Sequence, residues 1–116
     1  MIRLPHKEPL IYAKQVLNAD ENSANVELNF GESPTLAMHV EAAAQAFSFI
    51  DRQDSGTWGV VAMIKNSNLK CKKQDIDYIC KVSIVQSIHP YYKVYFQNFS
   101  KDGIEVADGE LSIKIF

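Results

Sequence analysis

The sequence predicts a single α+β domain in which one long helix packs against an antiparallel sheet. One segment alone has helical periodicity, the segments around it have strand-like patterns, and turn residues separate them. The length of 116 residues fits one domain over 1–116. Because 47% of the residues are apolar, the chain can form a hydrophobic core and disorder is not expected.

The residues before the helix predict a hairpin of two strands. The first strand is expected over 10–19, after a segment whose prolines favour an extended backbone. A polar turn follows at 20–23. Apolar and polar residues then alternate over 24–30, which is typical of a strand with one buried face.

The predicted helix follows a Gly-Glu-Ser-Pro break at 31–34. Ser33 is the expected N-cap and Pro34 the expected first helical residue, and no Gly or Pro interrupts the segment from there to 51. Apolar residues recur at steps of four and three and form one stripe, at Leu36, Val40, Ala43, Phe47 and Ile50. Alanines beside the stripe would let the helix approach a sheet or a second helix closely.

Four further strands are predicted after the helix, over 58–64, 77–88, 91–99 and 104–116. The first is strongly apolar, which predicts a strand covered on both faces. Turn residues separate the others at 89–90 and 101–103, and a bulge is expected at Gly109.

Composition argues against several classes of function. The 12 basic and 14 acidic residues give a net charge of −2 without a basic tract of the kind that binds nucleic acid. No apolar run approaches the about 18 residues of a membrane span, and the N-terminus lacks the apolar run of a signal peptide, so a cytoplasmic protein is expected. Cys71 and Cys80 lack metal-site spacing and are expected to be free thiols. No metal or cofactor is expected.

Four strings in order along the chain resemble one family. They are Leu-Pro-His-Lys-Glu-Pro-Leu at 4–10, Val-Glu-Ala-Ala-Ala-Gln-Ala at 40–46, Met-Ile-Lys-Asn at 63–66 with Leu-Lys at 69–70, and the final strand at 106–113. With the order of the elements, they resemble 3-hydroxyacyl-(acyl-carrier-protein) dehydratases. This resemblance implies the hotdog fold, in which an antiparallel sheet of about five to six strands wraps one central helix.

The resemblance also implies an activity. The family eliminates water from a 3-hydroxyacyl thioester, using a histidine as base and a helix carboxylate of the other subunit as acid. A backbone N–H at the helix start polarises the thioester carbonyl. The implied partners are a thioester of acyl-carrier-protein or CoA and a second subunit, in a homodimer, a higher homo-oligomer or a heterodimer. No nucleic acid or membrane partner is implied.

Site residues follow position by position. Glu41 occupies the place of the family's helix carboxylate, and Phe30 and Pro34 match the loop before the helix. Asn29 stands where the family has its histidine, and an amide cannot act as a base near pH 7. The chain is also about two residues shorter between this loop and the helix, where the family's Pro-Gly turn presents the N–H donor.

Other residues are weaker candidates for the site. Gln45, one turn after Glu41, is expected to bind substrate together with Phe30, Pro34 and His6. For His6, in the opening string, the resemblance favours a structural role in positioning the first strand. His39 lies about 200° from Glu41 around the helix, so a packing or surface role is expected. Aromatic residues could line an acyl tunnel but are more often part of a core, namely Phe47, Phe49, Trp58, Phe96 and Phe99.

Three hypotheses remain open from the sequence. The first is a 3-hydroxyacyl-thioester dehydratase or a close relative in which the acid–base pair is incomplete. The second is a thioesterase of the same fold, in which Glu41 with Gln45 activates water. The third is a non-catalytic acyl-binding subunit of a heterodimer whose partner supplies the base.

Overall fold

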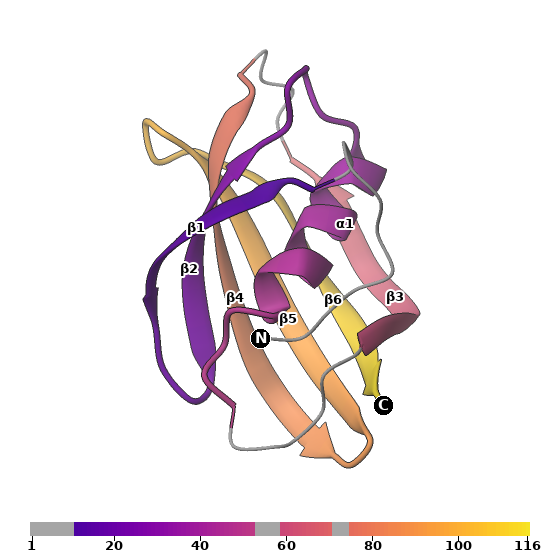
Figure 1. Ribbon diagram of the computed structural model, residues 1–116. Coiled ribbons are helices and arrows are strands. Elements are labelled where there is room, and N and C mark those ends of the chain that lie inside the picture. Colours follow the sequence, from indigo (N-terminus) through magenta and orange to yellow (C-terminus); the bar gives the residue numbers. More distant parts are fainter. Residues whose placement is uncertain (1–10, 53–58, 71–74) are drawn as a thin grey trace.

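The computed structural model describes residues 11–52, 59–70 and 75–116. Within these ranges, one helix packs against a six-stranded antiparallel sheet that curves around it (Figure 1). In chain order the elements are β1 (Ala13–Ala19), β2 (Ser23–Asn29), α1 (Leu36–Phe47), β3 (Gly59–Leu69), β4 (Asp77–Ile88), β5 (Tyr91–Ser100) and β6 (Glu105–Ile115). The predicted α+β class is confirmed.

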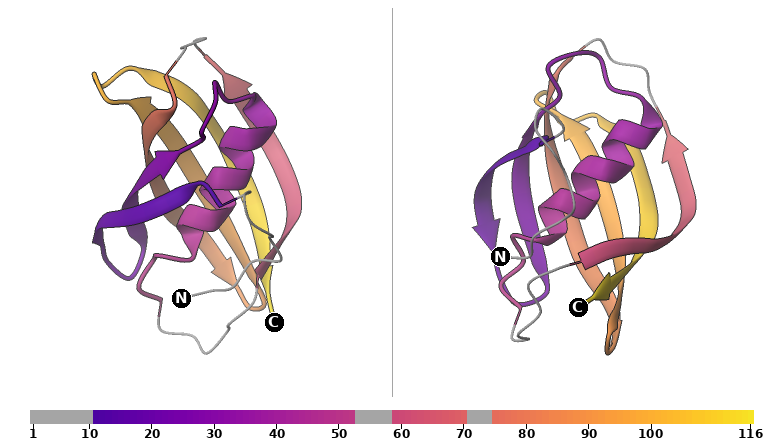
Figure 2. Two further views of the ribbon diagram at one scale, coloured as in Figure 1. Left: turned by 45° about the horizontal axis from the view of Figure 1, so that its top comes forward. Right: turned by 45° about the vertical axis from the view of Figure 1, so that its right-hand side comes forward.

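The strand order in the sheet is β1-β2-β4-β5-β6-β3. β1 and β2 form the predicted hairpin, and β4, β5 and β6 are joined by tight turns. α1 carries the chain across the concave side of the sheet from β2 to β3, which is the last strand on the opposite edge (Figure 2). β1 and β3 are therefore the two edge strands.

α1 begins two residues later than predicted, because Thr35 and not Ser33 is its N-cap. Thr35 Oγ1 accepts a hydrogen bond from the Met38 N–H at 3.3 Å, and the Thr35 N–H donates to Met38 Sδ at 3.5 Å. The helix ends at Phe47, before the predicted end at 51, with Ser48 as its C-cap. A hydroxyl oxygen directly before the helix satisfies an otherwise unpaired N–H, which fixes the helix start.

β3 differs most from its prediction. It runs beyond the predicted end at 64, and it is an edge strand and not one covered on both faces. Met63 and Ile64 are 59% and 54% exposed. Its register against β6 shifts twice, between Val61 and Met63 and between Lys65 and Asn68. An apolar strand sequence does not distinguish burial inside one chain from exposure at an edge.

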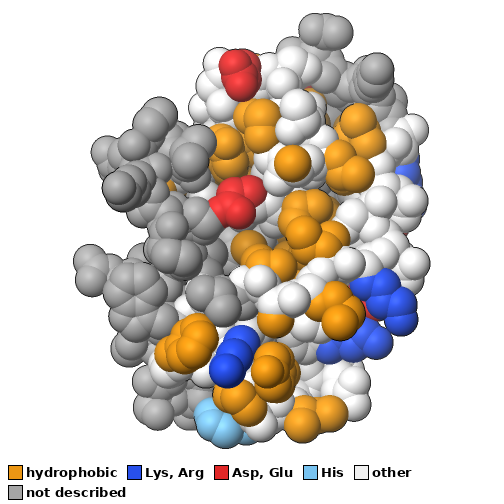
Figure 3. All heavy atoms as spheres, turned by 90° about the vertical axis from the view of Figure 1, so that its right-hand side faces the viewer, with side chains coloured by type: hydrophobic (Ala, Val, Ile, Leu, Met, Phe, Trp, Pro, Cys, Tyr) orange, Lys and Arg blue, Asp and Glu red, His pale blue; other side chains and the backbone are white. Residues whose placement is uncertain are grey.

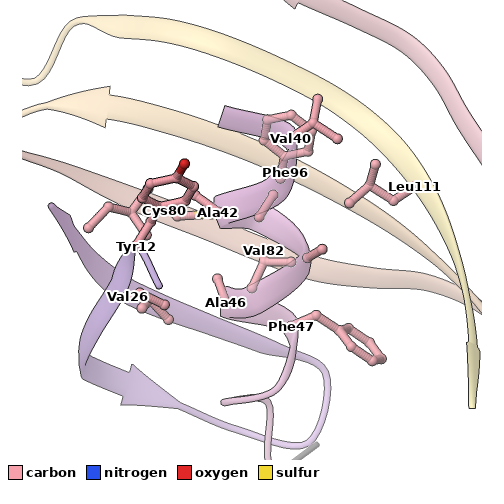
Figure 4. Packing of buried hydrophobic residues seen from close by; sticks show 14 of the residues in the cluster. Tyr12, Val26, Val40, Ala42, Ala46, Phe47, Cys80, Val82, Phe96 and Leu111 are labelled. Carbon is pink, nitrogen blue, oxygen red and sulfur yellow. The ribbon is translucent and has the colours of Figure 1, made fainter. Parts of the chain in front are cut away.

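The core lies between α1 and the concave face of the sheet. Side chains of the helix stripe, such as Val40 and Phe47, meet Val82 of β4, Phe96 of β5 and Leu111 of β6 (Figure 4). All five are buried. Full burial of such a side chain contributes roughly 1.5–3 kcal/mol to folding. The stripe predicted from periodicity is therefore the surface that holds helix and sheet together.

Cys80 lies in this core as a free thiol, and burial raises its pKa. Cys71 lies outside the described residues. Among the described residues, no group of His, Cys, Asp and Glu side chains could hold a metal ion. In the same part of the chain, no helix has the length and apolar character needed to cross a membrane.

Candidate functional site

Glu41 lies on the wall of an apolar hollow between the first turns of α1 and the edge strand β3. The hollow has a volume of about 360 Å³. Its described lining residues are apolar apart from Glu41 and one serine, and they are Leu36, Ala37, Val40, Glu41, Val61, Ile64 and Ser67. We call this feature the Glu41 hollow.

Local geometry explains why these residues meet. Leu36, Val40 and their neighbours at 37 and 41 are one helical turn apart, so they share one side of α1. On β3, the register shift after Val61 brings Ile64 to the same face of the sheet as Val61, although the two are three positions apart. The hollow therefore depends on a bulge in β3 that could not be predicted from the sequence.

The β3 side of the molecule is shown in Figure 3. Hydrophobic side chains gather over the middle of this face, and charged side chains are sparse there. A half-buried carboxylate beside such a surface is in a position to accept or donate a proton to a group on an otherwise apolar ligand. Among the described residues that line the hollow, Glu41 is the only ionisable one.

Gln45 has a structural role in the observed contacts. Its Oε1 accepts hydrogen bonds from the Tyr12 N–H at 2.6 Å and the Ala13 N–H at 3.1 Å. Gln45 is 5% exposed, and the Glu41 hollow is lined by other residues. The side-chain oxygen of Gln45 therefore links the start of β1 to α1 through two accepted hydrogen bonds.

Asn29 does not face the Glu41 hollow of its own chain. Alternation along β2 places its side chain on the convex face of the sheet, opposite α1. There its Nδ2 donates to Asp77 Oδ1 at 2.7 Å, and its Oδ1 accepts from the Gly31 N–H at 3.1 Å. Both ends of the amide hold the turn into the loop before α1.

Phe30 and His39 belong to a buried aromatic cluster. The Phe30 ring lies 5.0 Å from both Tyr12 and His39 and 5.5 Å from Tyr78. His39 Nδ1 lies 3.0 Å from Asn98 Nδ2, and burial lowers the pKa of His39 to about 4. Of the packing and surface roles expected for His39, the structure shows the packing role, and Phe30 is likewise part of the core.

The remaining candidates are spread over the fold. Pro34 is half-buried in the loop that leads into α1. Phe47 and Phe96 are fully buried in the core and do not line the hollow, which confirms the core reading for these two aromatics. His6 and Trp58 lie outside the described residues.

Ser67 is the lining residue that the sequence did not single out. It lies in the second bulge of β3, where Asn66 and Ser67 stand opposite Gly109 alone. The bulge expected at Gly109 is thus carried by the facing strand, since Gly109 itself keeps regular pairing with Phe96. A serine in a polar Asn-Ser-Asn stretch carries no motif, so only its position opposite a glycine could have indicated it.

A second hollow, of about 230 Å³, lies on the convex face of the sheet between β4, β5, β6 and β3. Charged groups line it, including Lys65, Lys93 and Glu110. Lys93 Nζ lies 3.8 Å from Glu110 Oε2, and both side chains are partly exposed. This is an ordinary solvated ion pair on a sheet face, and we place the candidate site at the Glu41 hollow.

Comparison with known proteins identifies the fold. No family model matches the sequence, and no curated protein matches it. Among solved structures, the dehydratase heterocomplex ApeI:P from Xenorhabdus doucetiae is similar, with a TM-score of 0.78, 15% identity, and coverage of 97% of this chain and 88% of that chain. An HP0420 homologue from Helicobacter felis has a TM-score of 0.67 and 13% identity over 97% of this chain and 93% of that chain.

A hypothetical thioesterase from Streptococcus pneumoniae, solved as a Thr-to-Ala mutant, is also similar. Its TM-score is 0.55 at 13% identity, over 98% of this chain and 93% of that chain. At these identities the similarity establishes the fold alone. The predicted hotdog fold, with one central helix and an antiparallel sheet of six strands, is confirmed.

Proposed function

We propose that this hotdog-fold chain is an acyl-thioester protein of the dehydratase-like type, in which Glu41 supplies the carboxylate of the site. The observation that carries this proposal is the position of Glu41 on the wall of an apolar hollow beside an edge strand. An acyl chain needs an apolar lining, and its reactive end needs a proton donor or acceptor. The Glu41 hollow offers both, and the neighbours named as a dehydratase heterocomplex and a hypothetical thioesterase support the assignment.

In a dehydration, one group removes the α-proton of the 3-hydroxyacyl thioester, and a second protonates the hydroxyl that leaves as water. Glu41 in its protonated form is suited to the second task. The first task requires a base that the described part of the chain does not place beside Glu41. Asn29 is an amide on the convex face, and His39 is held in the aromatic cluster.

We place the base on a second subunit, and β3 is where that subunit would dock. β3 is an unpaired edge next to the hollow, with Met63 and Ile64 exposed on it. Such edges pair readily with a second strand. The partner is either another copy of this chain or a related hotdog subunit that carries a histidine. The neighbour named as a dehydratase heterocomplex supports the second form.

A thioesterase is the second candidate. In that reaction a single carboxylate deprotonates a water molecule, which attacks the thioester carbonyl and releases the thiol. This candidate is favoured by Glu41 being the only ionisable residue among the described lining of the hollow. A role for Gln45 in activating this water together with Glu41 is not favoured, because its oxygen accepts hydrogen bonds from the N–H groups of Tyr12 and Ala13.

The test is a direct assay of the purified protein with 3-hydroxyoctanoyl and octanoyl thioesters of CoA and of acyl-carrier-protein. Enoyl product is followed by its absorbance, and free thiol by a thiol reagent. If Glu41 is the acid or base, Glu41→Gln should lower the observed rate by roughly 100-fold or more. Glu21→Gln, in the exposed turn between β1 and β2, is the matched control and should leave the rate unchanged.

The products separate the candidates. Enoyl product that depends on Glu41 supports the dehydratase, and thiol release that depends on Glu41 supports the thioesterase. Absence of both, also in mixtures with candidate partner subunits from neighbouring genes, would contradict both enzymes. Calorimetric titration with octanoyl-CoA would then decide whether the chain is a non-catalytic acyl-binding subunit.

A further inference from the structure

We propose that the Ser67 hydroxyl is the donor that binds the thioester carbonyl oxygen in the Glu41 hollow. This inference rests on the proposed acyl-thioester function and adds a residue to the site. Three features of Ser67 support this role: its position in a β-bulge, the absence of a side chain at Gly109 opposite it, and a buried hydroxyl without a hydrogen-bond partner among the described residues.

Ser67 lies in a β-bulge, where β3 departs from regular pairing with β6. Between Lys65 and Asn68, two residues of β3 stand opposite one residue of β6. Asn66, the first of the two, has a φ of 55°, in the left-handed region that non-glycine residues rarely adopt. Bulges of this kind redirect a side chain and are frequent beside active sites. Here the bulge places Ser67 in the lining of the hollow.

Gly109 provides the space that Ser67 occupies. A Cβ at position 109 would lie 2.4 Å from Ser67 Oγ and 2.9 Å from the Phe96 ring. Any other residue at 109 would therefore displace Ser67 or the aromatic ring beneath it. Ser67 Oγ lies over this gap, and a rotation about its Cα–Cβ bond to another staggered rotamer would aim the hydroxyl at the hollow.

The hydroxyl of Ser67 is a buried polar group whose hydrogen bonds are not satisfied within the described part of the chain. Its Oγ is buried, and within the described part of the chain it has no hydrogen-bond partner. Buried polar groups are nearly always hydrogen-bonded, because an unpaired one destabilises the folded state. An exception on the wall of a ligand-sized hollow is explained if the partner is the ligand itself.

The ligand chemistry follows from the lining. Apart from Glu41, the other described lining side chains are apolar, so the Ser67 hydroxyl is the one hydrogen-bond donor among them. The carbonyl oxygen of an acyl thioester is an acceptor flanked by an apolar chain.

The test compares two ligands in two protein variants, so that only the carbonyl contact differs. Octanoyl-CoA has the carbonyl, and S-octyl-CoA, its thioether, lacks it. Affinities are measured by calorimetry in a Glu41→Ala background, which keeps the thioester intact and adds no second donor to the hollow. We expect Ser67→Ala to weaken octanoyl-CoA binding by about tenfold, as for loss of one hydrogen bond. Binding of S-octyl-CoA should change by less than twofold.

Stability distinguishes this role from a structural one. Since Ser67→Ala removes a hydroxyl without a partner, the melting temperature should stay the same or rise. Ser112→Ala, on the convex face of β6, is the matched control and should alter neither affinity. Equal weakening for both ligands, or none for either, would overturn the role of Ser67 and leave the proposed function standing. If neither ligand binds the protein with Glu41 and Ser67 intact, the proposed function fails, and this inference fails with it.

Discussion

At the scale of single residues, the most unusual environment is that of His39. The imidazole is 1% exposed and lies between the rings of Phe30 and Tyr78. Its ring nitrogen Nδ1 lies beside Asn98 Nδ2, which donates to Nδ1 when the ring proton is on Nε2. Burial disfavours the charged form, and this lowers the pKa of His39 from 6.5 to about 4.

This burial links stability to pH. Between pH 6.5 and 4, His39 is protonated in the unfolded chain and neutral in the folded one, so the unfolded state binds more protons. The free energy of unfolding should therefore be highest above pH 6.5 and should fall as the pH drops to 4. The expected contribution of His39 to this fall is about 3 kcal/mol. Urea denaturation across this pH range measures it.

His39→Leu is the variant that isolates this contribution. It should be less stable at pH 7, because Asn98 Nδ2 loses its contact with the ring and keeps only the long one to the backbone carbonyl of residue 39. Its stability should nevertheless fall less steeply between pH 6.5 and 4. His89→Leu, at an exposed position in the turn after β4, should keep the steep dependence of the unmodified protein. Equal slopes in the His39 variant and the unmodified protein would show that His39 is not the linked group.

At the scale of elements, the join between β1 and α1 depends on one side chain. Gln45 Oε1 accepts both the Tyr12 and Ala13 N–H groups, at the point where the chain enters the sheet edge. β1 is otherwise exposed along most of its length and pairs with β2 through two register shifts. We call this pair of hydrogen bonds to Gln45 the clamp, and it holds the exposed edge strand β1 against the helix.

Loss of this clamp should be costly. Gln45→Leu keeps the volume but leaves two buried N–H groups without their acceptor, and each such group costs roughly 1–3 kcal/mol. We expect the free energy of unfolding to fall by about 2–4 kcal/mol, as measured by urea denaturation. Gln15→Leu, exposed on β1, is the matched control and should change it by about 0.5 kcal/mol or less. A similar effect of both variants would contradict the clamp.

The elements also show how far the sequence could predict this fold. The helix stripe and the bounds of β4, expected at 77–88 and found at Asp77–Ile88, were predictable because periodicity and turn residues are local signals. The helix start was placed two residues early, since Ser33 and Thr35 are both capping types and the choice depends on backbone conformation.

The candidate site was predictable to a smaller extent. Glu41 could be found from a family string and from its place beside the helix stripe. Ser67 could not, because its position depends on a bulge in β3 that forms only against Gly109 of β6. The role of Gln45 was also hidden, since its hydrogen-bond partners lie more than thirty residues away in the chain. Pairing between distant segments is not recorded in local patterns.

At the scale of the whole molecule, the two edges of the sheet are unequal. Both β1 and β3 are exposed, but only β3 borders the Glu41 hollow and has apolar side chains that are more than half exposed, Met63 and Ile64. An apolar edge of this kind favours association with a second strand. The partner would then close the hollow from outside, so the proposed dimer interface and the proposed site would share the β3 edge.

We therefore expect the protein to be a dimer in solution. Light scattering after gel filtration, at tens of micromolar, should give about twice the chain mass of 13.1 kDa. Met63→Lys places a charge on the β3 edge, as natural edge strands do to prevent pairing, and should weaken the dimer by at least about tenfold. Val85→Lys replaces a side chain of similar exposure, 56%, on the central strand β4 and should leave the dimer intact. A monomeric unmodified protein, or equal loss of dimer in both variants, would place the partner elsewhere and separate the Glu41 hollow from any shared interface.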